Sequence, residues 1–418
     1  MRRPGYEGAF WPSPLQQGVL DTILLPDEAA RGAWLRIRPG LTMADLWDTE
    51  VHRALPLVLR ALRRMGIDDP GIPTMEGVAR RAWFANQMRI RGVAPTIGRL
   101  EAAGISTMLL KGMPVAIAYY GDLSLRPMGD VDVLVPAAQR EQAVDLLVRD
   151  GWRAIEHVDP AFNHGVGFIH PDGRALDLHW QPSMTWVLTP RDVAAADGLW
   201  AMAEPLDFGG VRTRVPCPAD MLIHLCVHGA WANSGATLRW ITDATCVMRT
   251  AGARMDWDLV IDRIAQSRLG PQMTGPLHYL SRFGDPAVPP GVRKAVGAMP
   301  STRRERRHHR VSVCDTTRRR RTGHLRAAVA TWFHRTTRRS RREALRDLLP
   351  YLRQHFGVAR TRDIPRIALG KAVRTITGRG ESAPPLPQTP HSAGGIAVAR
   401  AHHDGQTGQG PADQAADT

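Results

Sequence analysis

The chain has 418 residues, of which 43% are hydrophobic and 23% charged, as expected for a globular protein that buries one or two substantial cores. No stretch approaches 18 consecutive apolar residues, and the start of the chain lacks the apolar segment of a signal peptide, so we expect no membrane span and a cytoplasmic location. The four cysteines have neither Cys-x-x-Cys spacing nor the density of a disulfide scaffold, which excludes a small disulfide-stapled domain.

The net charge of +15 is concentrated in one block of the sequence. Residues 301–346 hold sixteen arginines against Glu305, Asp315 and Glu343, which leaves the rest of the chain close to neutral. A nucleic acid could therefore bind only through this block. An acidic partner, an anionic membrane surface or a solvated arginine-rich helix could equally account for it. Aromatic side chains are scarce there, which disfavours a platform for base stacking.

The N-terminal part of the chain is predicted to be helical. Apolar residues recur with helical spacing between Leu46 and Leu62 and again between Ala82 and Met88, and a segment rich in glycine and proline at 66–74 separates the two helices. We therefore assign residues 1–104 to an N-terminal helical lobe.

A strand, a glycine turn and a helix start are predicted next. An apolar run after Ile105 ends in Lys111 and Gly112, and Pro114 suits the first turn of a helix, where its missing N–H costs nothing. Backbone N–H groups at such a junction attract an anion, and Gly112 would let a phosphate approach closely. Lys111 is one of only three lysines and would add a compact positive charge. The alternative is a strand-end lysine that extends to solvent.

Two acidic residues follow on one face of a hydrophobic strand. In Arg126-Pro-Met-Gly-Asp130-Val-Asp132-Val-Leu-Val135 the two aspartates point the same way, with Cα atoms roughly 7 Å apart, while the valines point into a core. Paired acids on a rigid strand can hold Mg²⁺ with positions left open for phosphates, whereas the alternative is a strand end with two solvated acids. Arg126 is expected either to neutralise phosphate or to pair with Asp122 or Asp130.

A predicted hairpin brings a third acid to this strand. After an amphipathic helix at 140–150, the segments 164–170 and 174–180 alternate polar and apolar residues around a Pro-Asp-Gly turn. Asp177 and His179 share one face of the second strand, so Asp177 can lie beside the first two aspartates. Three convergent carboxylates suit a two-metal site for phosphoryl transfer. His179 is interpreted as a hydrogen-bonding neighbour of the site, with direct catalysis as the alternative.

From Pro218 to Leu269 the chain is predicted to return to helix, with Pro218 and Asp220 as the start signal. His224 and His228 lie four residues apart and could chelate zinc. However, the chain lacks the Glu of a His-Glu-x-x-His motif at this place, so a pair of core or pocket-lining histidines is the preferred interpretation.

Taken together, these motifs resemble a known family. The order Leu-Lys-Gly, Tyr-Tyr-Gly-Asp, Arg-Pro-Met-Gly-Asp-Val-Asp-Val-Leu-Val and Leu-Asp-Leu-His-Trp, within roughly Leu41 to Leu269, is similar to the bacterial nucleotidyltransferase family proteins of the DNA polymerase β-like nucleotidyltransferase superfamily. The resemblance implies an α+β fold, in which a polymerase β-like core with a mixed sheet is flanked by N- and C-terminal helical lobes. It also implies that Asp130, Asp132 and Asp177 are the catalytic residues and the metal ligands.

The resemblance also implies which residues bind the nucleotide and which surround the acceptor. The wider superfamily has Gly-Ser or Gly-Gly before the helix, where this chain has Lys111-Gly112, so the triphosphate contacts depart from the common pattern. Both residues and Arg126 are nevertheless expected to bind the nucleotide. Sequences similar to His228-Gly229 and to Trp240 with Asp243 recur in the family. The residues expected near the metals or around the acceptor pocket are therefore His179, His228 and Asp243.

The expected reaction is Mg²⁺-dependent transfer of a nucleoside monophosphate from a nucleoside triphosphate, ATP by preference, to a small-molecule or peptide acceptor, with Mn²⁺ as a possible substitute and pyrophosphate as the product. The expected organisation is a nucleotidyltransferase core at 105–215, a helical substrate lobe at 216–300, an arginine-rich helical extension at 301–377 and a disordered tail at 378–418. One alternative is a catalytically inactive binding protein that contacts RNA or an acidic partner through the arginine block. Another is an enzyme with a polymeric acceptor such as a tRNA end, which the near-neutral core disfavours.

Overall fold

The structure is a computed structural model, and it describes most of the chain between residues 11 and 365. The described residues are 11–41, 49–156, 158, 160, 163–182, 198–232, 238–283, 288–312, 328–329, 332–333, 341–356, 358 and 360–365. The predicted tail at 378–418 lies outside them, as do residues 313–327 and 334–340 of the arginine block.

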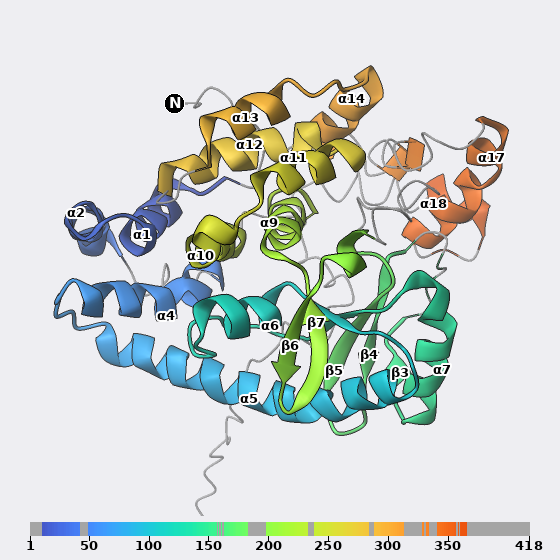
Figure 1. The fold of residues 1–418 in the computed structure, drawn as a ribbon, viewed down its shortest axis with the longest axis horizontal. Coiled ribbons are helices and arrows are strands. Elements are labelled where there is room, and N and C mark those ends of the chain that lie inside the picture. The colour runs from blue at the N-terminus through green and yellow to red at the C-terminus, as the bar shows by residue number, and fades with distance from the viewer. Residues whose placement is uncertain are drawn as a thin grey trace, which may run out of the picture.

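A mixed sheet forms the centre of the molecule (Figure 1). Its strands are β1 (Met108–Leu110), β2 (Asp132–Leu134), β3 (Arg153–Ala154), β4 (Gly165–Ile169), β5 (Ala175–His179), β6 (Glu204–Phe208) and β7 (Val211–Val215). They are arranged in the order β3-β4-β5-β2-β1-β7-β6. The pairs β2 with β5 and β1 with β7 are parallel and the other four are antiparallel.

The predicted hairpin is confirmed as β4 and β5. Its register runs from Gly165 opposite His179 to Ile169 opposite Ala175. Gly173 has a φ of 87°, a value that favours glycine, which explains why the turn is built on Pro-Asp-Gly.

The N-terminal helices begin ahead of the region where the apolar pattern was clear. They are α1 (Pro14–Leu24), α2 (Asp27–Ile37), α4 (Thr49–Arg64) and α5 (Ile72–Ala102). Ser13 starts α1 with a capping box, because its hydroxyl accepts from the Gln16 N–H while the Gln16 side chain accepts from the Ser13 N–H. The long helix α5 runs along one side of the sheet (Figure 1), where its Ile97 and Leu100 are fully buried in the sheet's apolar core.

A second group of helices covers the opposite side of the sheet (Figure 1). This helical lobe comprises α9 (Pro218–Val227), α10 (Arg239–Ala251), α11 (Trp257–Gln266), α12 (Gly270–Leu280), α13 (Pro290–Gly297) and α14 (Arg303–Ser312). Every residue of α9 is buried, so this helix is the centre of the lobe. Glu305 in the first turn of α14 is buried and pairs with Arg268 at 2.6 Å, so packing of the lobe continues past residue 300.

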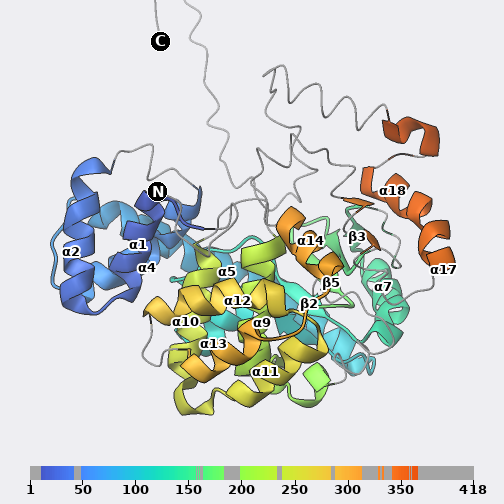
Figure 2. The ribbon, with the colours of Figure 1, turned by 90° about the horizontal axis from the view of Figure 1, so that it is seen from above.

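Three further helices lie beside the sheet and beyond the lobe (Figure 2). They are α7 (Arg140–Arg149), α17 (Arg341–Arg346) and α18 (Leu348–Phe356). Trp332, which the sequence places among arginines, is buried in a small apolar cluster, where its indole N–H donates to the Ala344 carbonyl at 2.7 Å and its ring stacks on Tyr351. This aromatic is therefore a core residue and is not displayed for base stacking.

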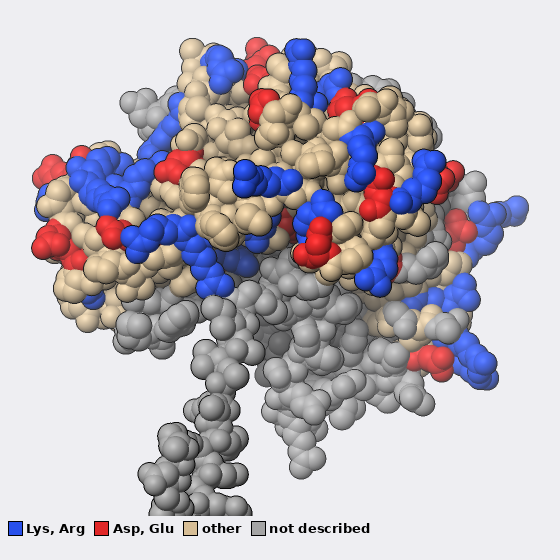
Figure 3. Space-filling model, turned by 90° about the horizontal axis from the view of Figure 1, so that it is seen from below, with Lys and Arg blue, Asp and Glu red and all other residues tan. Residues whose placement is uncertain are grey.

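The expected α+β fold class is confirmed by the mixed sheet and its two groups of helices. In the part of the chain that the structure describes, no helix has both the length and the apolar character needed to cross a bilayer. Lys and Arg side chains are spread over the face shown in Figure 3 with Asp and Glu among them, so this face is not a basic platform.

Candidate active site

Two of the three predicted acids lie side by side on neighbouring strands. The parallel register of β2 and β5 pairs Asp132 with Asp177, and both side chains leave the sheet on the same face. Val131, Val133 and Val135 point the other way and are fully buried, as the alternating pattern predicted. Asp130 precedes β2, because the strand begins only at Asp132, so the first acid comes from the chain leading into the strand and not from the strand itself.

Asp132 is held by two donors on one of its oxygens. The Lys111 ammonium donates to Oδ1 at 2.5 Å, and His179 Nε2 lies 2.9 Å from the same atom. The carboxylate can only accept, so Nε2 carries the proton. Although burial alone would raise it, the Lys111 charge and the His179 hydrogen bond hold the pKa of Asp132 well below its usual range. Asp132 is therefore a fixed anion at the floor of the site.

The pKa of Asp177 is shifted in the opposite direction to that of Asp132. Burial, together with the neighbouring carboxylates of Asp132 and Asp130, raises its pKa to about 7. Within the described part of the chain, its Oδ1 is buried and has no hydrogen-bond partner. A buried carboxylate oxygen without a donor is costly, and a cation at this place would remove both the repulsion and the missing contact.

This donor set fits a hard divalent cation. Ligand atoms of Asp132, Asp177 and His179 lie within 4.8 Å of one another. Carboxylate oxygens are the ligands that Mg²⁺ prefers, and the imidazole is already committed to Asp132 through Nε2. The carboxylates could therefore hold such an ion, and the hydrogen bond from His179 orients one of them.

Lys111 has an unusual backbone conformation. Its φ of 55° and ψ of −118° fall in a region that favours glycine, so a residue with a side chain costs about 1–3 kcal/mol there. The predicted strand, turn and helix are present: β1 ends at Leu110, and α6 (Gly112–Pro114) continues into a π-helix, η2 (Val115–Tyr120). Strain that is retained at a polar cavity is a hallmark of functional residues.

Arg126 pairs with Asp243, which the sequence suggested as a site residue but not as the partner of Arg126. The predicted alternatives were Asp122 and Asp130, but Nη2 and Nε of Arg126 contact Oδ2 of Asp243 at 2.8 and 2.9 Å. Asp243 also accepts from the Tyr120 hydroxyl at 3.1 Å, and its side chain is 2% exposed. The prediction that Arg126 pairs with Asp122 or Asp130 is wrong, because the fold brings α10 against the loop that carries Arg126.

The guanidinium of Arg126 lies so close to Gly112 that there is no room for a side chain at this position. A Cβ atom at this position would lie 2.5 Å from Nη1 of Arg126. From the sequence, Gly112 was expected to let a phosphate approach closely. In the structure, the space beside Gly112 is filled by Arg126, which is fixed by Asp243.

The acids and cations line one cavity of about 280 Å³ between the sheet and the helical lobe. Its lining residues are Lys111, Gly112, Arg126, Met128, Asp130, Asp132, Asp177, Leu225, His228, Gly229, Arg239, Trp240 and Asp243. The predicted acids, cations, His228 and Asp243 thus surround one space, with His179 behind Asp132. Arg239 also lines this cavity, and the sequence did not single it out, because nothing local distinguishes it from the many other arginines.

The lobe side of the cavity is shaped by close packing. A Cβ atom on Gly229 would lie 2.0 Å from Cβ of Trp240, so only glycine allows α10 to approach the end of α9 here. Burial, followed by the Lys111 charge, keeps the pKa of His228 well below its usual value, so this imidazole is neutral. His224 is buried beside it, and no third ligand among the described residues completes a zinc site with the pair. This favours the interpretation of core and pocket-lining histidines.

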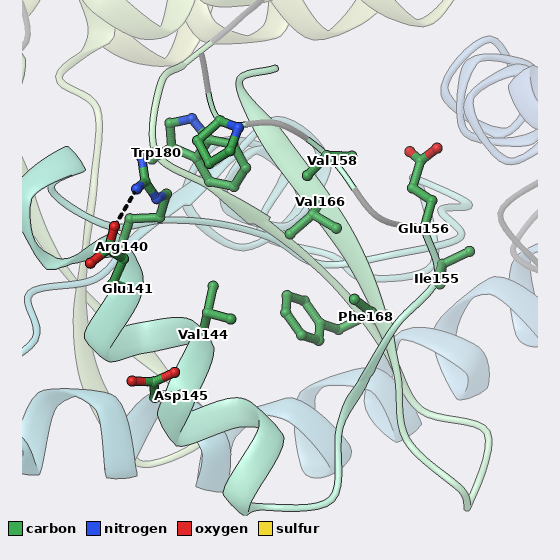
Figure 4. Close-up of a pocket in the computed structure, with 12 residues that line it drawn as sticks. Arg140, Glu141, Val144, Asp145, Ile155, Glu156, Val158, Val166, Phe168 and Trp180 are labelled. Atoms are coloured by element: carbon green, nitrogen blue, oxygen red, sulfur yellow. Dashed lines mark hydrogen bonds and ion pairs between the residues drawn. The ribbon is translucent and has the colours of Figure 1, made fainter. Parts of the chain in front are cut away.

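A larger hollow of about 500 Å³ lies between α7 and the edge strands of the sheet. Its wall is mainly apolar, with Val144, Val166, Phe168 and Trp180 facing into it and charged residues such as Arg140 at its rim (Figure 4). Trp180 follows the same alternation as Leu176 and Leu178, so this hollow opens on the face of β5 away from Asp177. The predicted acids therefore face the smaller cavity and not this hollow.

The mixed sheet, with carboxylates on adjacent strands facing a polar cavity, is the arrangement of a nucleotidyltransferase core. Residues 46–284, more than half of the chain, match the family described as uncharacterised nucleotidyltransferase, and the chain belongs to this family. A comparison with curated proteins found no match. Among solved structures, the chain is similar to the crystal structure of an antigenic nucleotidyltransferase-like protein from Paracoccidioides brasiliensis, with 15% sequence identity and a TM-score of 0.31, covering 51% of this chain and 94% of that one. The predicted family is thus confirmed at the level of nucleotidyltransferases.

Proposed function

We propose that the protein transfers a nucleoside monophosphate from a nucleoside triphosphate to a small-molecule or peptide acceptor and releases pyrophosphate. The observation that carries this proposal is the convergence of Asp132 and Asp177 on one cavity, where a buried oxygen of Asp177 has no donor among the described residues. Family membership and the three cations in the lining of the same cavity support a polyanionic substrate.

Asp130, Asp132 and Asp177 would hold Mg²⁺, or Mn²⁺ in its place. When bound, the ion stabilises negative charge that develops on the phosphoryl oxygens and the leaving group. His179 keeps Asp132 oriented through the 2.9 Å hydrogen bond. Asp177 would also assist in removing the proton from the acceptor hydroxyl. Most of the rate gain would come from positioning and electrostatics, since phosphoryl transfer requires little covalent chemistry from the protein.

The nucleotide is proposed to be ATP, and the site to work in the cytoplasm. A small acceptor is favoured over a nucleic acid because positive charge outside the arginine block is nearly balanced by acids, and because the face shown in Figure 3 carries charged side chains of both signs. Calorimetric titration with a non-hydrolysable ATP analogue, with Mg²⁺ and with a chelator, tests the proposal. Binding is expected only with Mg²⁺, and an affinity that does not change with the chelator would contradict it.

Lys111→Met is expected to weaken binding of the ATP analogue by about 1.5–3 kcal/mol, the usual contribution of a charge-assisted hydrogen bond. Lys111→Arg should rescue only part of the affinity, because a planar guanidinium does not replace a compact ammonium at a tight turn. The strained backbone remains in both variants, so their difference reports the charged group. Lys294→Met, at an exposed position of α13, is the matched control. Unchanged affinity in Lys111→Met would make Lys111 only a structural partner of Asp132.

A further inference from the structure

Of the three cations that line the cavity, Arg239 lies farthest from its acidic partner. Lys111 is paired with Asp132 at 2.5 Å, and Arg126 makes two contacts with Asp243. Among the described residues, Arg239 forms an ion pair with Glu50 alone, and the 3.9 Å between Nε and Oε2 is too long for a hydrogen bond. Its Nε is buried and has no hydrogen-bond partner within the described ranges.

Glu50 is also engaged elsewhere. Its Oε2 accepts from the Leu238 backbone N–H at 3.2 Å, at the start of α10, and its Oε1 contacts Arg53 at 3.4 Å. The carboxylate therefore anchors the first turn of α10 and does not form a fork with the Arg239 guanidinium. A bidentate partner is what an arginine in a desolvated site normally has.

The surroundings of Arg239 favour an anionic ligand. Burial first, and then the neighbouring Arg126 charge, lower the pKa of Arg239 to about 10, so the guanidinium remains charged at neutral pH. Two guanidinium groups near each other, one of which lacks a hydrogen-bonded acid among the described residues, are costly unless an anion lies between or beside them. Arg239 reaches this cavity from α10, whereas Asp130, Asp132 and Asp177 come from β2, β5 and the chain leading into β2.

We propose that Arg239 binds the terminal phosphates of the nucleoside triphosphate, as the phosphate-recognising residue of the helical lobe. This inference rests on the proposed function and specifies how the substrate is held. The carboxylate side of the cavity serves the reacting phosphate, while a planar guanidinium with several N–H donors matches the oxygens of the pyrophosphate that leaves. An acceptor with its own anionic group is the competing ligand for the same guanidinium.

The test compares the wild type with Arg239→Met by calorimetric titration in the presence of Mg²⁺, using a non-hydrolysable ATP analogue and inorganic tripolyphosphate. Both affinities are expected to fall by the same factor, roughly 10- to 100-fold, because the two ligands share only the phosphate chain. Arg239→Lys should recover part of the loss. Arg254→Met removes the same charge just after α10 from a side chain that is 62% exposed, and it should leave both affinities unchanged.

The outcomes separate this inference from the function on which it rests. If the wild type binds neither ligand, the proposed function fails and the role of Arg239 fails with it. If the wild type binds both and Arg239→Met binds them equally well, only the role of Arg239 is overturned, and the guanidinium is left for the acceptor. Thermal unfolding without ligand provides the structural control: removing a buried charge that has only a distant acid as its partner should leave the melting temperature unchanged or higher. A lower melting temperature with unchanged binding would show that Arg239 serves only to pair with Glu50.

Discussion

Asp132→Asn and Asp177→Asn are both expected to abolish nucleotidyl transfer, with rate losses of about 1,000-fold or more, yet to change the stability of the metal-free protein in opposite directions. Each variant removes a charged ligand with almost no change in volume. Pyrophosphate release in the presence of Mg²⁺ measures the first effect, and circular dichroism checks the fold. Full activity in either variant would show that the acids on β2 and β5 are not the metal ligands.

The stability effects differ because the two carboxylates have different surroundings. Asp132 is stabilised by Lys111 and His179, so Asp132→Asn leaves a buried ammonium without its anion and should destabilise the protein by about 1–3 kcal/mol. Asp177 is repelled by its neighbours, so Asp177→Asn should stabilise the metal-free protein by roughly 1–3 kcal/mol at pH 7.

The raised pKa of Asp177 also makes the stability of the metal-free protein depend on pH. The pKa of Asp177 is raised from 3.8 to about 7, so the folded state binds its proton more tightly than the unfolded state does. Its contribution to stability is fully present below pH 4 and is lost as the pH rises through 7. Urea denaturation with a chelator should therefore show the advantage of Asp177→Asn growing between pH 4 and pH 7. A constant difference across this range would contradict the assignment.

The predictable parts of the site are those that depend on local sequence patterns. Alternation along 126–135 placed the valines in the core, and the Pro-Asp-Gly turn fixed the hairpin that carries Asp177. Because β5 then pairs in parallel with β2, Asp177 comes to lie beside Asp132, as expected. The α+β class and the return to helix at Pro218 follow from the same kind of signal, a change in hydrophobic period.

The parts that were not predictable depend on contacts between distant segments. Arg126 and Asp243 are 117 residues apart, and no local spacing shows that α10 packs against the loop before β2. The role proposed for Arg239 was not predictable for the same reason, because the 3.9 Å distance to its partner Glu50 is known only from the folded structure. The positive φ of Lys111 is a third case, since a lysine gives no hint of a conformation that favours glycine.

Asp243→Asn is expected to be among the most destabilising single substitutions in the helical lobe, at about 3–5 kcal/mol, because it leaves the Arg126 guanidinium buried without an anion. The Tyr120 hydroxyl loses its charged acceptor in the same step. Urea denaturation at pH 7 measures the change. The double variant Arg126→Met/Asp243→Leu should recover much of the lost stability, since it removes both charges and keeps the volume filled.

The double variant also decides what Arg126 does. If Arg126 serves mainly to join the loop before β2 to α10, the double variant should bind the ATP analogue nearly as well as the wild type once its fold is restored. If Arg126 also contacts the triphosphate, binding should fall by roughly 10-fold or more although stability recovers. A loss below about 1 kcal/mol in Asp243→Asn would show that the ion pair contributes little. Arg126 would then be free to bind phosphate, and the packing of α10 would rest on its apolar face alone.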